Sequence, residues 1–316
     1  MTMDTFFIPA SLVAGGLLAV QAGANAQLSK ATGSPFTATT LQLSVGTLAL
    51  LAVALATGTL TALAGLPAVP WWHVIGGTAS AFYVVSTILL FPRLGAVVAV
   101  GLFIAGQMLA SFALDTFGLL GVTPKALTPA MAGGTLAVLL GAAAIVAGQA
   151  GSLRQALAGK AGWIVLALLA GAVLPVQGVV NGLLRQDLGA PFAVGAVSFF
   201  VATLAMAATL LLVALFRRAP AAPSPAAPAP GSALRGMPWW GWLGGLAGAA
   251  YVTTVFTAIP AIGASAAVGL TVAGQQVASV FVDRYGWFRL PQRPVSSLRT
   301  AGVAVLLLGV AIIKLL

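Results

Sequence analysis

Amide side chains stand at matching places in the two halves of this sequence. Gln21 and Asn25 lie four residues apart, and Gln177 and Asn181 repeat this spacing 156 residues later (181 − 25). On a helix, residues four apart share a face, so each pair presents two amides to one neighbour. An amide both donates and accepts hydrogen bonds. The pairs therefore suit the binding of a polar or zwitterionic solute, and they suit hydrogen bonding between helices equally well.

A second polar pattern is longer and ends in an acid. Its members follow the spacing i, i+4 and i+8 in each half: Gln107, Ser111 and Asp115, then, 168 residues later (283 − 115), Gln275, Ser279 and Asp283. Polar groups cost free energy in lipid. A polar stripe two turns long must therefore face the interior of a helix bundle or a cavity.

The two acids have two interpretations. Asp115 and Asp283 lie at the C-terminal ends of their predicted helices, where the helix dipole disfavours an anion. Lys125 and Arg293 follow each acid by ten residues (125 − 115 and 293 − 283), which favours a structural ion pair at the helix end. Membrane carboxylates also serve as proton relays and gates, so coupling or gating is the alternative.

Aromatic residues also repeat at the second offset. Tyr83 and Tyr251 are predicted to face the same cavity as the amides, and each follows a Pro-Trp-Trp sequence, at Pro70 and Pro238. Tryptophan is enriched where a helix leaves the membrane. The Trp pairs are therefore interpreted as interface anchors.

Several chemistries are excluded by composition. The chain has no cysteine and one histidine, so a thiolate nucleophile, a metal site or a histidine base would have no partners. No catalytic residue, metal ligand or cofactor is predicted. The formal charge of +10 is assigned to loops that meet anionic lipid, and no nucleic-acid partner is expected.

Composition places the chain in a membrane. Hydrophobic residues make up 60% of it and charged residues 6%, and the mean hydropathy is +1.08, whereas soluble domains are about 25% charged. A run of about 20 apolar residues crosses the bilayer as a helix, and helices satisfy their own backbone groups there. The predicted fold class is an all-α membrane protein. Ten spans are predicted, at 5–28, 36–63, 71–91, 95–114, 130–149, 161–184, 191–216, 239–259, 263–283 and 299–316.

The matching motifs divide the chain into two five-helix repeats, 1–150 and 151–316. An odd number of spans in each repeat inserts the second copy upside down. Lys and Arg number three on the N-terminal side of the membrane and eleven on the other, so the positive-inside rule places both termini outside. The Pro- and Ala-rich linker 218–235 is predicted to be a cytoplasmic spacer.

The same motifs resemble the YdcZ-like branch of the drug/metabolite transporter (DMT) superfamily. The residues that carry the resemblance are Gln21 to Asn25, Ser34-Pro35-Phe36, Pro70 to Tyr83, Pro92 to Ala96, Ala105-Gly106-Gln107 and Ser111 to Gly118, with most of them repeated in the second half. The resemblance implies a ten-helix carrier of the cell (inner) membrane made of two fused five-helix units. It implies no particular substrate.

The function that we predict is secondary transport of a small polar or amphipathic solute by alternating access, with export preferred. A central cavity between spans 1, 4, 6 and 9 would bind the solute through Gln21, Asn25, Gln107, Gln177, Asn181, Gln275, Tyr83 and Tyr251. Proton coupling, an electroneutral facilitator, a passive channel and a non-transporting assembly protein that docks through Gly-rich helix faces are the alternatives. A membrane enzyme is disfavoured, and the sequence carries no signal of oligomeric state.

Overall fold

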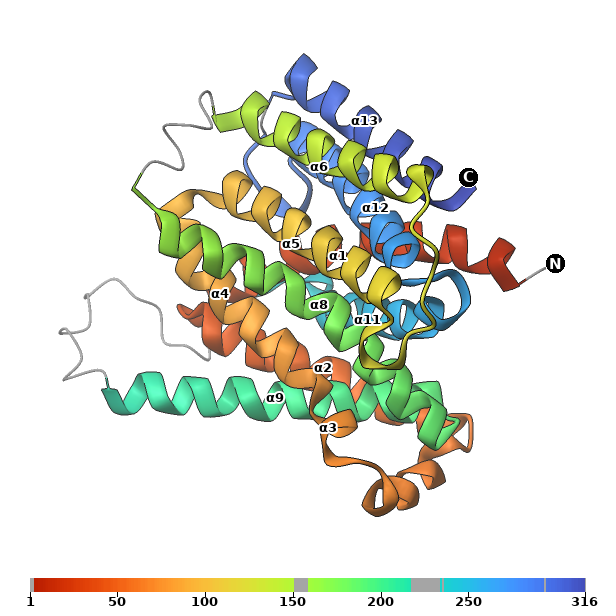
Figure 1. Ribbon diagram of the computed structural model, residues 1–316. Helices are drawn as coiled ribbons and strands as arrows, with labels where there is room; N and C mark the ends of the chain where they lie inside the picture. The colour runs from red at the N-terminus through yellow and green to blue at the C-terminus, as the bar shows by residue number, and fades with distance from the viewer. Residues whose placement is uncertain (1–2, 151–158, 217–233, 235, 293, 316) are drawn as a thin grey trace.

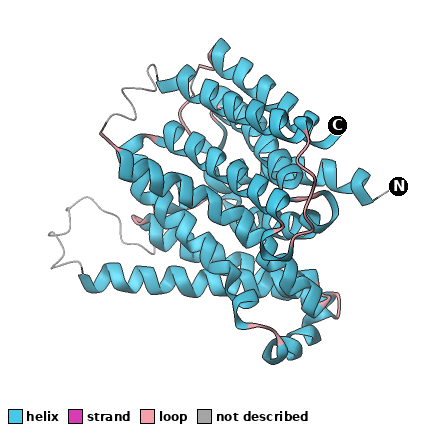
Figure 2. Cartoon of the chain, in the orientation of Figure 1, coloured by secondary structure: helices cyan, strands magenta, loops and turns pink. Residues whose placement is uncertain are grey.

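The computed structural model describes residues 3–150, 159–216, 234, 236–292 and 294–315. Over these residues the chain is helical and has no strand, as Figure 2 shows. The helices are α1 (Met3–Thr32), α2 (Pro35–Ala56), α3 (Trp71–Val74), α4 (Thr78–Leu94), α5 (Ala96–Phe117), α6 (Pro129–Ala150), α8 (Ala161–Leu188), α9 (Pro191–Phe216), α11 (Leu243–Ile262), α12 (Ala264–Tyr285) and α13 (Ser297–Leu315). Short 3₁₀ turns lie between them, namely η1 (Thr59–Ala68), η2 (Ile75–Gly77), η3 (Leu119–Gly121), η4 (Trp239–Trp242) and η5 (Trp287–Arg289).

Most of the predicted spans are confirmed as long apolar helices. Within the described residues, nine helical segments are long and apolar enough to cross a membrane, and the tenth predicted span corresponds to a shorter apolar helix, 297–313 of α13. The all-α membrane fold is therefore confirmed, whereas the count of ten spans stays a prediction. The predicted end of the second span at residue 63 is wrong. Gly58 takes φ 70°, in the left-handed region that ends a helix, so α2 stops at Ala56.

The helices form one bundle whose two faces can be named by the chain ends. Figure 1 places the start of α1 and the end of α13 at the same end of the bundle, which is called face A here. The opposite end, face B, holds the start of α5 and the end of α12. Figure 1 also shows α6 and α13 side by side along one edge and α9 along the opposite edge.

Glycines set how closely α6 and α13 approach. A Cβ added at Gly141 would lie 2.6 Å from the carbonyl oxygen of Gly302, and one added at Gly134 would lie 2.7 Å from that of Gly309. Only glycine leaves room for such backbone contact. These two helices therefore pack against each other along their length.

Two further crossings hold the helices that carry the polar patterns. At the α1–α12 crossing, a Cβ on Gly15 would lie 1.9 Å from the carbonyl oxygen of Thr271. At the α5–α8 crossing, a Cβ on Gly171 would lie 2.1 Å from that of Phe103. The two glycines are 156 residues apart (171 − 15), so matching positions of the two halves make the same kind of contact.

Candidate functional site

The second-half amides form a buried network between α8, α9 and α4. The side chains of Gln177 and Asn181 are 4% and 0% exposed. Ser80 Oγ donates to Gln177 Oε1 at 2.9 Å, and Gln177 Nε2 lies 2.8 Å from the same hydroxyl. Ser198 Oγ accepts from Asn181 Nδ2 at 2.9 Å and from Gln177 Nε2 at 3.4 Å. Two serines thus bond both side-chain nitrogens and Gln177 Oε1, whereas Asn181 Oδ1 has no partner among the described residues.

The first-half amides are packed at the matching place but are not satisfied. Asn25 Nδ2 has only a long contact of 3.4 Å to Thr39 Oγ1. Within the described part of the chain, Asn25 Oδ1 and Gln42 Nε2 are buried without a hydrogen-bond partner, and the amide of Gln21 makes no hydrogen bond. Gln21 lies instead against the bare backbone of Gly248. The first half therefore keeps open hydrogen-bonding capacity that the second half has used.

The difference follows from two residue exchanges between the halves. Gly248 stands 168 residues after Ser80 (248 − 80), and Gln42 stands 156 residues before Ser198 (198 − 42). Each serine hydroxyl that serves the second-half amides is thus replaced, beside the first-half amides, by the bare Gly248 or by the amide of Gln42. Gln42 was missed in the sequence because its counterpart is a serine, so no repeated amide marks it.

The longer polar stripes lie on α5 and α12. Gln107 is 5% exposed and Gln275 is half-buried, and within the described residues neither amide makes a hydrogen bond. Ser111 Oγ donates to the backbone carbonyl of Gln107 at 2.7 Å. These two amides are therefore a further source of unused hydrogen-bonding groups, although no described contact joins them to the first-half cluster.

The two tyrosines lie one helical turn from the amide contacts. Tyr251 follows Gly248, which Gln21 touches, and Tyr83 follows Ser80, which bonds Gln177. Tyr83 packs against Phe103 of α5, with ring centroids 5.1 Å apart. Tyr251 is 7% exposed and belongs to the hydrophobic core of the bundle.

Asp115 does not pair with Lys125, contrary to the ion-pair interpretation. Its carboxylate is fully buried and accepts from the backbone amides of Ala264 and Ser265, at 2.8 and 2.7 Å. Lys125 Nζ donates to the carbonyl of Ile262 at 2.9 Å. The acid at the end of α5 therefore caps α12, where free amides and the helix dipole both favour an anion.

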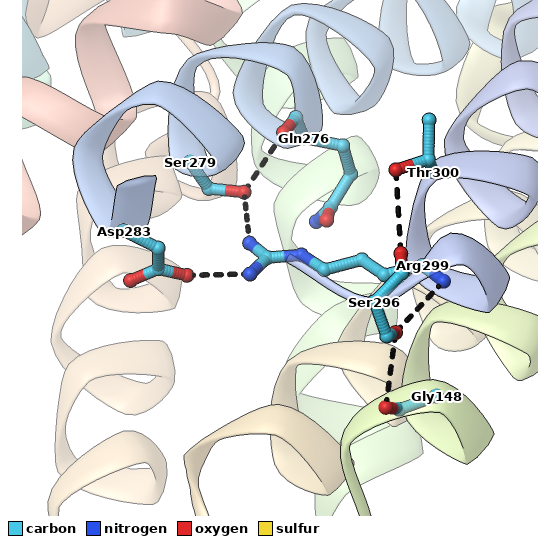
Figure 3. Close-up of polar contacts among 7 residues, drawn as sticks. All are labelled: Gly148, Gln276, Ser279, Asp283, Ser296, Arg299 and Thr300. Carbon is cyan, nitrogen blue, oxygen red and sulfur yellow. Dashed lines mark hydrogen bonds and ion pairs between the residues drawn. The ribbon is translucent and has the colours of Figure 1, made fainter. Parts of the chain in front are cut away.

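Asp283 finds a different partner in α13. Its predicted partner Arg293 lies outside the described residues, and within them the carboxylate pairs with Arg299, Nη1 to Oδ2 at 2.7 Å. Figure 3 shows the guanidinium between Asp283 and Ser279, whose hydroxyl it reaches at 3.2 Å. Arg299 is 3% exposed. Sequence offers a reason for the asymmetry, since Met131 occupies the place of Arg299 in the first half (299 − 168).

One polar pair was not found from the sequence. His73 Nδ1 lies 2.5 Å from Asp187 Oδ2, joining α3 to the end of α8 at face A. Their places in the other half are Gly241 (73 + 168) and Ala31 (187 − 156). No repeat therefore pointed to the pair.

Two pockets are described, and neither is lined by a predicted site residue. One, of about 380 Å³, lies between α1 and Thr254 of α11 and is apolar. The other, of about 280 Å³, opens at face A between η3, α8 and the end of α11 and includes Lys125 and Gly263. The central cavity predicted between α1, α5, α8 and α12 is not among them. Of the candidate amides, Gln107, Gln177 and Asn181 are buried and Gln21, Asn25 and Gln275 are half-buried.

The family model DMT_YdcZ, described as "Putative inner membrane exporter, YdcZ", matches residues 6–144 and 162–312. No curated protein matches the sequence, whereas 24 chains of solved structures do. One of these, described as "Crystal structure of protein", has a TM-score of 0.63 and 22% identity and covers 97% of both chains. At that identity the likeness concerns the fold alone.

Proposed function

The chain belongs to the YdcZ family of inner-membrane exporters of the DMT type, and on this premise we propose that it is a secondary transporter of a small polar solute. Transport runs by alternating access between two inverted five-helix repeats, 1–150 and 151–316, in the direction of export. The solute is bound by amides of the bundle, and both termini lie outside the cell.

The unequal state of the two amide clusters carries this proposal. A buried donor or acceptor without a partner costs about 1–3 kcal/mol, and within the described residues the first-half cluster holds two such atoms, Asn25 Oδ1 and Gln42 Nε2, where the second-half cluster holds one, Asn181 Oδ1. Among the described residues, Gln42 Nε2 on α2 is an unpartnered donor, and Asn25 Oδ1 on the neighbouring helix α1 is an unpartnered acceptor. A solute that accepts from one and donates to the other would satisfy both. Small metabolites that combine a carboxylate or carbonyl with an amine or amide have this chemistry.

The remaining predicted residues take supporting roles in the proposal. Gln21 contacts the solute beside Gly248, and Gln107 and Gln275 contact it when the bundle opens. Tyr83 and Tyr251 contact the solute as aromatic residues of the cavity. Gln177 and Asn181 bind solute only after their serine network has opened, in the other half of the cycle.

The alternative function, a non-transporting assembly protein, would need Gly-rich helix faces that are free for docking. In this structure those faces are covered inside the bundle. A Cβ on Gly245 would lie 2.3 Å from the carbonyl oxygen of Gln42, and one on Gly77 would lie 1.9 Å from that of Ser198. Such contacts leave no room there for a docking partner. This observation favours transport over assembly.

The test is solute flux in proteoliposomes across a panel of amino acids, amides and cationic drugs, with and without a pH gradient. Gln21→Ala is expected to lose at least about tenfold in solute affinity, the effect of about 1.4 kcal/mol. Gln292→Ala, which removes an exposed amide from a loop, is the matched control and is expected to transport normally. Normal flux by Gln21→Ala and Gln177→Ala together would reject the site assignment. Absence of flux for every solute would reject the transporter.

A further inference from the structure

The two halves hold their inter-helix turns in the same conformation but seal only one of them. Gly95 joins α4 to α5 with φ 82° and ψ 147°, and Gly263 joins α11 to α12 with φ 89° and ψ 159°. Glycine is required at both places because φ is positive. Each turn presents the first free amides of the helix that follows, which need an acceptor.

At face A the amides are occupied. Asp115 binds those of Ala264 and Ser265, which are 0% and 1% exposed. A Cβ at Gly263 would lie 2.0 Å from Lys125 Nζ and 3.3 Å from Asp115 Oδ2. Gly263 and Lys125 also line the pocket of about 280 Å³ at this face. The capped turn therefore forms part of the wall of this pocket, through Gly263.

At face B the equivalent amides are vacant. Nothing lies within 4 Å of a Cβ at Gly95, Ala96 is exposed, and within the described residues no acceptor is bonded to the amides of Ala96 and Val97. The acid that matches Asp115 is Asp283, which is held away by Arg299 at 2.7 Å. The glycine turn, the first free amides and the acid of the face A seal thus have counterparts at face B, in an unsealed arrangement.

We propose that Asp115 and Asp283 are alternating gate residues, each of which caps the first turn of the opposite helix hairpin in one of two states. In the state seen here Asp115 caps α12 and closes face A, while Asp283 forms an ion pair with Arg299. In the other state Asp283 leaves Arg299 and caps α5 through the amides of Ala96 and Val97, and Asp115 releases α12 so that the face A pocket extends inward. The inference rests on the proposed function, since it supplies the gates for alternating access.

The exchange can be measured without any solute, because the chain has no cysteine. Single-cysteine variants Ala96→Cys and Ala264→Cys report the two turns through their rate of labelling by a hydrophilic maleimide in lipid nanodiscs, where both faces meet water. The thiol introduced at position 96 is expected to react, and the thiol introduced at position 264 is expected to be protected. Asp115→Asn removes the charge and one acceptor, and Arg299→Gln releases Asp283. Each is expected to raise labelling at position 264 and lower it at position 96 by at least about tenfold, the effect of one hydrogen bond to a charged group.

Three comparisons decide the outcome. Asp187→Asn removes a carboxylate of face A that does not touch α12 and is expected to change neither rate. Asp115→Asn/Asp283→Asn is expected to expose position 264 without protecting position 96. If Asp115→Asn exposes position 264 and leaves position 96 unchanged, Asp115 is a static cap and the proposal is wrong, and a folded Arg299→Gln variant with unaltered rates has the same meaning. Reciprocal labelling without solute flux would support the gates while rejecting the transport function.

Discussion

Backbone contact at the glycine crossings makes the stability of the bundle sensitive to one added methyl group. A Cβ on Gly15 would lie 1.9 Å from the carbonyl oxygen of Thr271 and 2.6 Å from its carbonyl carbon. Such approaches are otherwise at least about 3 Å, so α1 and α12 must separate by about 1 Å. A gap of that size forfeits up to about half of the dispersion energy of the atoms in contact, and overpacking costs about 1–3 kcal/mol. Alanine returns at most about 1 kcal/mol of helix propensity.

Gly15→Ala is therefore expected to lower the free energy of unfolding by about 1–2 kcal/mol. Gly133→Ala is the matched control, because nothing lies within 4 Å of a Cβ there, and it is expected to be neutral or slightly stabilising. The assay is equilibrium unfolding in mixed micelles followed by tryptophan fluorescence. Gly171→Ala, at the matching crossing of α5 and α8, should resemble Gly15→Ala. Equal stability of the Gly15 and Gly133 variants would refute the reasoning that backbone contact at the crossing holds these helices.

Two further predictions concern polar contacts. Gly248→Ser gives the second half the serine that Ser80 provides in the first, and its nearest neighbour would be the flexible end of Gln21, with Nε2 2.6 Å from the new Cβ. The new hydroxyl is expected to bond Gln21, and the free energy of unfolding should be unchanged or about 1 kcal/mol higher. Solute flux in proteoliposomes is expected to fall. Unchanged flux would speak against solute contact by Gln21. Asp187→Asn weakens the bond to His73, whose side chain is 10% exposed. The variant is expected to lower the free energy of unfolding by about 1–3 kcal/mol in the same unfolding assay. An unchanged free energy would show that the pair adds no stability.

The helices and their membrane setting were predictable because they depend on local sequence. Whether about 20 residues can cross a bilayer depends on their own hydropathy and on hydrogen bonds within one helix. The predicted spans consequently agree with the described helices except at ends such as residue 63. That end was missed because a left-handed Gly58 terminates a helix through backbone conformation, which hydropathy does not report.

The repeated amides were also visible in the sequence, but their state was not. Gln21 and Gln177 occupy matching positions, yet within the described residues one is unpartnered and the other bonds Ser80. The outcome depends on which side chain the neighbouring helix brings within about 3 Å. Gln42 entered the candidate site only through the structure, since its counterpart Ser198 is a different residue.

Sequence alone determined the class of the protein, its apolar helices and the two candidate acids, because composition and spacing are properties of the chain itself. The tertiary structure decided which groups bond these acids. Asp115 bonds amides that lie 149 and 150 residues away, and Asp283 takes Arg299 on the next helix. A buried carboxylate binds the nearest donors that can replace its water. Which donors are nearest is settled by how the helices cross, and that is a property of the folded bundle.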